Sequence, residues 1–264
     1  MDLELDGKVA WVTGGSSGLG RATATALARE GAAVAISSRG REALDRVAGE
    51  IGHSSGGRCI PIALDVSEGA SIGPAAAAIE EQLGPVDILV ANAGGPPPGS
   101  FDELDENALA GAFELTTASA WRLTKAVLPS MRQRRAGALL YITSSSTKEI
   151  IPNLLLSNMM RAAVVGMAKT LSKQVAPENI RVACVAPGRI ETPRIHQLNQ
   201  AAADSSGRPV EEISAESQAG LPMGRYGDPQ EFGDVVAFLA SERASYVTGV
   251  SVVVDGGLLN GVLS

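Results

Sequence analysis

A glycine-rich stretch near the start of the chain has the residue types and spacing of a phosphate-binding turn. Residues 13–20 are Thr-Gly-Gly-Ser-Ser-Gly-Leu-Gly, between a short apolar run and an amphipathic segment. Gly14 permits a tight turn, Gly18 lets backbone approach a pyrophosphate, and Gly20 lets a helix pack closely on a strand. The helix N-terminus would then offer unpaired N–H groups to the phosphates. In this strand–turn–helix context we favour a dinucleotide site over a plain structural turn.

The end of the second apolar run indicates which dinucleotide is bound. An NAD site places a carboxylate there, roughly 20 residues after the glycines, to bind the ribose hydroxyls. Here residues 37–41 are Ser-Ser-Arg-Gly-Arg, and no acid occurs between Glu30 and Glu42. The guanidinium of Arg39, helped by Ser38, suits a 2′-phosphate. The sequence therefore predicts NADP(H) rather than NAD, the alternative being that these arginines only solvate a loop.

The elements that must position these residues alternate along the whole chain. Short β-branched runs, mostly apolar throughout as in parallel strands covered on both faces, predict strands. Those strands are Lys8–Val12, Ala33–Ser37, Cys59–Leu64, Val86–Ala91, Ala138–Thr143, Ile180–Ala186 and Val250–Val254. The predicted helices are Gly20–Glu30, Arg41–Ile51, Ile72–Leu83, Ala108–Gln133, Leu155–Val175 and Pro229–Leu239. We expect a doubly wound (Rossmann-type) α/β fold with a seven-stranded parallel sheet and helices on both faces.

The chain shows no linker or repeat, so residues 1–264 are predicted to form one domain. The stretch Ile190–Leu221 interrupts the alternation, being polar and without a strand pattern. We interpret it as a mobile flap over a pocket, the alternative being a tolerated surface insertion.

Composition limits the partners and the compartment. Hydrophobic residues make up 45% of the chain and the formal net charge is −7, with no basic cluster longer than residues 132–135, which argues against nucleic acid as a partner. No apolar run of about 18 residues and no signal peptide occur, so we expect no membrane span and a cytoplasmic protein. Cys59 and Cys184 are expected as core thiols, and His53 and His196 lie too far apart for a metal site.

Further short motifs occur in a fixed order after the glycine-rich turn. They are Asp65-Val66, Asn92-Ala93-Gly94, Pro187-Gly188 with Ile190 and Thr192, and Asp255-Gly256-Gly257. Together with residues 13–20 they resemble the short-chain dehydrogenase/reductase family over essentially the whole chain. The resemblance implies that Asp65 contacts the adenine and Thr192 holds the carboxamide end of the cofactor. The cofactor residues expected from the motifs and from the resemblance are Thr13, Gly14, Ser16, Ser17, Gly18, Leu19, Gly20, Ser38, Arg39, Asp65, Val66, Asn92, Ala93, Gly94, Arg161, Pro187, Gly188, Ile190 and Thr192.

The catalytic pattern of that family is altered here. Its members use a Ser together with a Tyr and a Lys spaced Tyr-x-x-x-Lys on one helix. Residues 162–171 fix the register and place Ser157 at the Tyr position and Arg161 at the Lys position. The active-site Ser is retained as Ser144, and a fourth family residue, an Asn, falls on Thr116. The chain is similar to an atypical subgroup of the 3-oxoacyl-carrier-protein reductase branch with Ser-x-x-x-Arg at these positions.

These departures leave the proton donor open. The hydroxyl of Ser157 is a far weaker acid than a phenol of pKa about 10, and a guanidinium such as Arg161 does not lose its proton, although it can hold ribose hydroxyls. Lys148 and Glu149 follow the serine run and are the local candidates for a displaced acid or base, the alternative being a solvated pair at a loop tip. His196 is a third candidate, and Tyr141 is expected in the core. The predicted catalytic residues are Ser144, Ser157, Arg161 and Lys148.

The function expected from the sequence is hydride transfer between NADP(H) and a carbonyl or alcohol substrate, such as a 3-oxoacyl ketone, with an atypical proton relay. Two alternatives stay open: a catalytically weak NADP(H)-binding sensor or scaffold, and an enzyme of another reaction class on the same scaffold. The resemblance also implies a homodimer or homotetramer, formed through the two long helices at residues 108–132 and 155–175 and through C-terminal packing.

Overall fold

The computed structural model describes residues 2–262, and its centre is a seven-stranded parallel sheet. The strand order is β3-β2-β1-β4-β5-β6-β7, so the chain reverses direction across the sheet between β1 and β4. The strands are β1 (Val9–Thr13), β2 (Ala33–Ser38), β3 (Cys59–Ala63), β4 (Ile88–Ala91), β5 (Gly137–Ile142), β6 (Ile180–Pro187) and β7 (Val250–Val254). All seven strands predicted from the sequence are present within a few residues of their expected bounds, and the doubly wound fold is confirmed.

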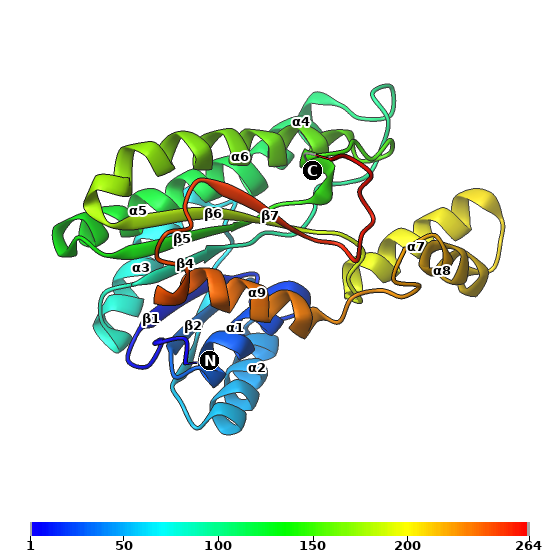
Figure 1. Ribbon diagram of the computed structural model, residues 1–264. Coiled ribbons are helices and arrows are strands. Elements are labelled where there is room, and N and C mark those ends of the chain that lie inside the picture. The colour runs from blue at the N-terminus through cyan, green and yellow to red at the C-terminus, as the bar shows by residue number, and fades with distance from the viewer. Residues whose placement is uncertain (1, 263–264) are drawn as a thin grey trace.

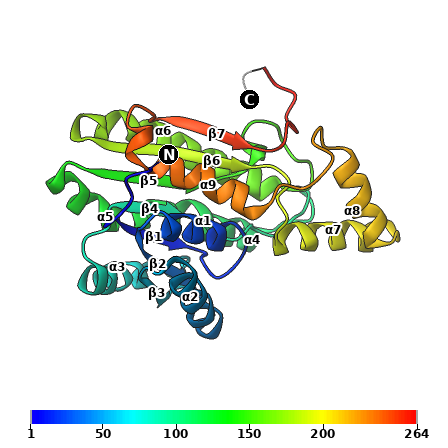
Figure 2. The same ribbon diagram turned by 60° about the horizontal axis from the view of Figure 1, so that its bottom comes forward.

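Helices cover both faces of this sheet, as Figures 1 and 2 show. On one face lie α1 (Gly18–Arg29), α2 (Arg41–Ser55) and α9 (Pro229–Ala240), and on the other lie α3 (Gly69–Leu83), α5 (Ser119–Arg134) and α6 (Leu155–Val175). Each face has its own apolar core: Leu27, Leu44 and Phe232 belong to the first, and Ile79 and Leu123 to the second. These cores hold the carboxyl ends of β1, β4 and β5 side by side at one end of the parallel strands, where ligands bind in open α/β folds.

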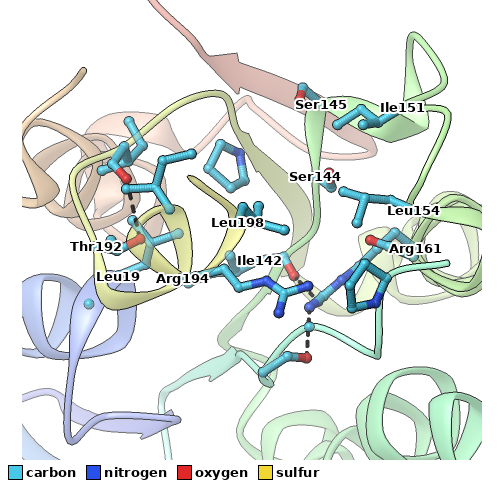
Figure 3. A pocket seen from close by; sticks show the side chains of 18 of the residues that line it. Leu19, Ile142, Ser144, Ser145, Ile151, Leu154, Arg161, Thr192, Arg194 and Leu198 are labelled. Carbon is cyan, nitrogen blue, oxygen red and sulfur yellow. Dashed lines mark hydrogen bonds between the residues drawn. The ribbon is translucent and has the colours of Figure 1, made fainter. Parts of the chain in front are cut away.

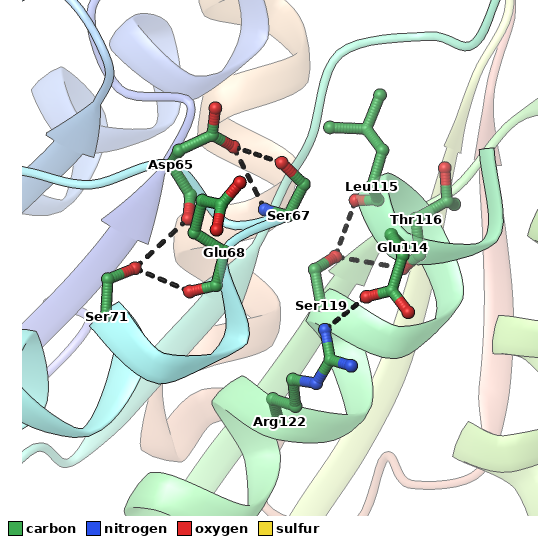
Figure 4. Close-up of polar contacts among 9 residues, drawn as sticks. All are labelled: Asp65, Ser67, Glu68, Ser71, Glu114, Leu115, Thr116, Ser119 and Arg122. Carbon is green, nitrogen blue, oxygen red and sulfur yellow. Dashed lines mark hydrogen bonds and ion pairs between the residues drawn. The ribbon is translucent and has the colours of Figure 1, made fainter. Parts of the chain in front are cut away.

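The expected helix Ala108–Gln133 is in fact three consecutive helical segments. They are α4 (Glu106–Ala112), a π-helical turn (Phe113–Ala118) and α5. The wider turn frees carbonyls from the usual helical ladder, and the hydroxyl of Ser119 donates to those of Leu115 (2.6 Å) and Thr116 (3.1 Å) (Figure 4). The prediction of one regular helix was wrong at this point, and such π turns often occur beside functional sites.

The segment predicted as a flap contains two helices, α7 (Pro193–Ser206) and α8 (Val210–Ala219). They extend from the body of the molecule beside the carboxyl ends of the strands (Figure 1). No residue of α8 is buried. The mobility of this segment stays a prediction. Among the described residues, no helix is long and apolar enough to cross a membrane.

Candidate functional site

A cleft of about 1350 Å³ opens at the carboxyl ends of the strands, between the sheet and α7. Nearly all of the predicted cofactor residues line it, and Thr13 and Gly20 are the exceptions. Three of the four predicted catalytic residues line it as well, namely Ser144, Ser157 and Arg161, whereas Lys148 does not. The fold therefore brings together predicted residues that are up to 178 positions apart in the sequence, from Gly14 to Thr192. The cleft volume exceeds the roughly 300–1,000 Å³ typical of a single ligand pocket.

Thr13 and Gly20 shape the cleft from behind. The hydroxyl of Thr13 donates to the carbonyl of Asn92 (2.6 Å) and accepts its backbone N–H (2.9 Å), which joins the ends of β1 and β4. A Cβ on Gly20 would lie 2.1 Å from the carbonyl oxygen of Gly14, so only glycine lets α1 begin this close to the turn. Gly14 itself has φ +62°, a conformation that favours glycine.

The start of α1 is prepared for an anion. Its N-cap residue Ser17 has extended backbone, and its side chain does not cap the helix. The first N–H groups of the helix thus keep their bonding capacity, and the helix dipole is positive at this end. Gly18 and Leu19 line the cleft directly beside this terminus. These residues fit the pyrophosphate of a dinucleotide, as the sequence predicts.

One end of the cleft, called the far end below, is formed by the carboxyl ends of β2 and β3. The hydroxyl of Ser38 is buried and has no hydrogen-bond partner among the described residues, while Arg39 is exposed beside it and lines the cleft. Asp65 instead accepts hydrogen bonds from the hydroxyl (2.6 Å) and the N–H (3.0 Å) of Ser67 (Figure 4). These bonds, together with the charge of Arg39, hold the pKa of the Asp65 carboxyl below its usual range. An unpaired hydroxyl beside a cation suits a 2′-phosphate.

The opposite wall comes from the two late motifs. A Cβ on Gly188 would lie 2.5 Å from the Cβ of Asp255, so the Pro187-Gly188 turn packs directly on the Asp255 motif. The carboxylate of Asp255 accepts the N–H groups of Gly257 (3.0 Å) and Leu259 (2.9 Å) and fixes that turn. Thr192 follows this turn in the sequence and lies near Gly18. A Cβ added to Gly18 would be 3.4 Å from the methyl carbon of Thr192.

Arg161 occupies the floor of the cleft (Figure 3). Ser157 and Arg161 lie one turn apart on the buried stripe of α6 that faces the sheet. The guanidinium of Arg161 donates to the carbonyl of Ile142 (2.7 Å) and to those of Ala93 (3.0 Å) and Gly94 (3.4 Å), which ties α6 to the ends of β5 and β4. Burial and the neighbouring charge of Arg194 lower the pKa of Arg161 to about 10, so it stays charged at neutral pH. The sequence did not predict these carbonyl contacts. The hydrogen bond from Arg161 to a ribose hydroxyl stays a prediction.

Arg194 is a site residue that sequence reasoning missed. It lies on the first turn of α7, lines the cleft and donates to the carbonyl of Pro96 (3.1 Å). Its position two residues after Thr192 was the available signal, because the chain there must pass over the cleft. Glu103 was missed too; it accepts two hydrogen bonds from Ser100, which lower the pKa of its carboxyl.

Comparison with known proteins places this geometry in a family. The family model described as "Enoyl-(Acyl carrier protein) reductase" matches residues 14–259. The chain belongs to the short-chain dehydrogenase/reductase family. It is 36% identical over 258 residues to 3-oxoacyl-[acyl-carrier-protein] reductase FabG of Vibrio cholerae, covering 97% of this chain and 99% of that protein. It is 35% identical over 256 residues to oxidoreductase UcpA of Salmonella typhimurium, covering 96% and 95%.

Solved structures agree with this assignment. L-sorbose reductase of Gluconobacter frateurii, crystallised with NADPH and L-sorbose, superposes with a TM-score of 0.94 at 31% identity, covering 99% of this chain and all of that one. This short-chain dehydrogenase/reductase is therefore an oxidoreductase by family. Its cleft is lined by Ser157 and Arg161, for which the sequence predicts the places of the family's Tyr and Lys.

The structure narrows the search for a displaced proton donor in this family member. Tyr141 is buried, as predicted; its hydroxyl lies 2.6 Å from that of Thr124, and burial raises its pKa. His196 does not line the cleft and pairs with Glu191 at 2.8 Å. Of the two residues after the serine run, Glu149 lines the cleft and Lys148 does not. Glu149 is therefore the better placed of the candidates from the sequence.

Proposed function

We propose that the protein is an NADP(H)-dependent oxidoreductase that interconverts a carbonyl compound, such as a 3-oxoacyl ketone, and its alcohol through an atypical proton relay. The observation that carries the proposal is the convergence of the cofactor motifs and Ser144 in one cleft whose far end offers Ser38 and Arg39 and no carboxylate at the end of β2. A bound nicotinamide supplies or accepts the hydride.

The preference for NADP(H) rests on charge. The guanidinium of Arg39 and the hydroxyl of Ser38 would bind the 2′-phosphate, while the glycine turn and the start of α1 would bind the pyrophosphate. The NADPH in the crystals of L-sorbose reductase supports the same choice.

The substrate oxygen would be held by the hydroxyl of Ser144. This side chain lies at the end of β5, where it accepts the N–H of Ser146 (3.1 Å) and caps a short turn over Ser145–Thr147. Ser157 adds a second hydroxyl on the α6 side, and Arg161 keeps a fixed positive charge that stabilises developing negative charge on oxygen. Neither Ser157 nor Arg161 supplies a proton, so we place proton exchange at water between Ser144 and Glu149.

The cofactor experiment compares NADPH with NADH. Arg39→Gln should raise the Kd for NADPH by about 10- to 100-fold, the range expected when hydrogen bonds to a charged group are lost, and leave that for NADH nearly unchanged. Arg41→Gln is the matched control, because Arg41 pairs with Asp45 (2.9 Å) and does not line the cleft. Equal losses for both cofactors, or a loss for Arg41→Gln alone, would contradict the assignment. Tight NADPH binding without any turnover would favour a sensor or scaffold.

Exposed apolar side chains on α5 and on neighbouring elements bear on the assembly of the protein. Trp121 on α5 is 57% exposed, and Phe113 and Met159 are also exposed apolar side chains on neighbouring elements. We propose that α5 and α6 form the contact of a homodimer or homotetramer, which light scattering after gel filtration would test with Trp121→Glu as the disrupting variant.

We also propose that α7 and α8 move as the flap predicted over the substrate end of the cleft.

A further inference from the structure

Two guanidinium groups meet at the centre of the cleft, one from α6 and one from α7 (Figure 3). Arg161 and Arg194 each donate to a carbonyl of the loop after β4, Arg161 to Ala93 (3.0 Å) and Arg194 to Pro96 (3.1 Å). Within residues 2–262 no carboxylate forms an ion pair with either of them. The protein has a net charge of −7, yet it leaves this pair of cations without a counter-ion.

Holding two like charges together away from water is unfavourable. Burial and the charge of Arg194 lower the pKa of Arg161, and burial also lowers the pKa of Arg194. Carbonyl dipoles offset only part of this cost, whereas an anion between the two groups would offset it more fully. The geometry thus has the charge of an anion site.

Of the two arginines, Arg194 has more N–H groups left for a ligand. Arg161 is buried and donates to three carbonyls. Arg194 is half-buried, and among the described residues only its Nη2 atom has a hydrogen-bond partner. Its guanidinium lies flat against Gly95, where an added Cβ would be 2.9–3.0 Å from three of its atoms. The remaining N–H groups suit two-point binding of a carboxylate.

The anions of the cofactor have other partners in the proposed site. The start of α1 would hold the pyrophosphate, and Ser38 with Arg39 would hold the 2′-phosphate. Apolar side chains line the cleft on both sides of this pair: Leu198 follows Arg194 one turn later on α7, and Ile151 and Leu154 lie across the cleft on the α6 side (Figure 3). A ligand fitting these walls has an anionic group and an apolar body.

We propose that Arg194 determines substrate specificity by binding a carboxylate, so that the substrate is an oxo acid or hydroxy acid with an aliphatic chain. This inference rests on the proposed redox function, since it names the substrate class of the same site.

The experiment measures NADPH oxidation with 2-, 3- and 4-oxooctanoate and with the methyl ester of each. The protein should prefer one of the acids to its ester. Arg194→Gln should lower kcat/KM for that acid by about 10- to 100-fold, the range for a lost hydrogen bond to a charged group, and change the ester by less than about 3-fold. Arg194→Lys should retain part of the preference. Arg208→Gln is the matched control, because Arg208 follows α7, pairs with Glu216 and does not line the cleft.

Three results would overturn the inference. The first is turnover of ketones with no preference for acid over ester. The second is an equal loss on acid and ester in Arg194→Gln. The third is a rise in the Kd for NADPH in Arg194→Gln with an unchanged acid-to-ester ratio, which would assign the guanidinium to the cofactor pyrophosphate.

A failure of the redox function gives a different result. If none of the substrates supports oxidation of NADPH, calorimetry with octanoate in the presence of NADP⁺ still tests the anion site. Binding of octanoate that is lost in Arg194→Gln and kept in Arg208→Gln would support the site without the reaction. No octanoate binding by the unaltered protein would overturn it.

Discussion

The guanidinium of Arg161 donates to the carbonyl of Ile142 at 2.7 Å, which joins the second turn of α6 to the last residue of β5. The same side chain bonds Ala93 and Gly94, so one residue fixes three segments around the cleft. These contacts explain how the cleft can keep its shape with an Arg at the position where the sequence predicts the family's Lys.

Replacing Arg161 should therefore affect folding as well as activity. Arg161→Ala should lower the free energy of unfolding by about 2–4 kcal/mol, because buried carbonyls lose their donor and a cavity is left. Arg161→Lys should lose less, since an ammonium still donates but cannot reach all three carbonyls. Urea unfolding measures both; equal stability of Arg161→Ala and the natural protein would mean that the carbonyl contacts contribute nothing.

The glycine turn predicts a sharp contrast between two glycine substitutions. Gly20→Ala puts a Cβ 2.1 Å from the carbonyl oxygen of Gly14, so the start of α1 must shift; we expect a loss of about 1–3 kcal/mol and at least a 10-fold weaker NADPH affinity. Gly49 lies in α2 with open space around it, so Gly49→Ala should raise stability by about 0.5–1 kcal/mol. Thermal unfolding and NADPH titration check both. An unaffected Gly20→Ala would show that the turn is looser than described.

Tyr141→Phe tests whether a buried phenol takes the role of the family's Tyr, whose place the sequence assigns to Ser157. We expect unchanged kcat, because burial raises the pKa of Tyr141 and its hydroxyl faces Thr124 rather than the cleft. Stability should fall by about 1 kcal/mol for the lost hydrogen bond. Steady-state kinetics beside thermal unfolding separates the two effects, and a fall in kcat of more than about 10-fold would place Tyr141 in the relay.

Much of this architecture was accessible from the sequence, because strands and the glycine turn are local patterns. The run Lys8–Val12 predicts a buried parallel strand, observed at Val9–Thr13, and residues 13–20 predict the turn that follows it. What escaped prediction depends on contacts between distant segments. The π turn at Phe113–Ala118 packs on α6, and the partners of Arg161 come from positions 93, 94 and 142. No periodicity in the local sequence carries that information.

The segment α7–α8 shows the same limit of prediction from the sequence. Its polar composition led to the prediction of a mobile flap, which stays a prediction, and α8 buries none of its residues. Composition did not reveal that two regular helices form there, nor that Arg194 reaches across to the carbonyl of Pro96.

The proposed relay makes Glu149 the group that exchanges the proton. Glu149→Gln should reduce kcat for alcohol oxidation by about 100-fold, the lower range for loss of a general base. The control is Asp102→Asn, an exposed acid that does not line the cleft. A large loss in Lys148→Gln with none in Glu149→Gln would instead support the residue predicted from the sequence.

The most direct test of the central claim is absorbance at the reduced-nicotinamide band with NADPH and a panel of ketones that includes 3-oxoacyl thioesters, comparing the natural protein with Ser144→Ala. Our account predicts substrate-dependent oxidation of NADPH that falls by at least about 100-fold in Ser144→Ala, with the Kd for NADPH unchanged. Tight NADPH binding with no oxidation for any ketone, or oxidation that does not depend on Ser144, would contradict it.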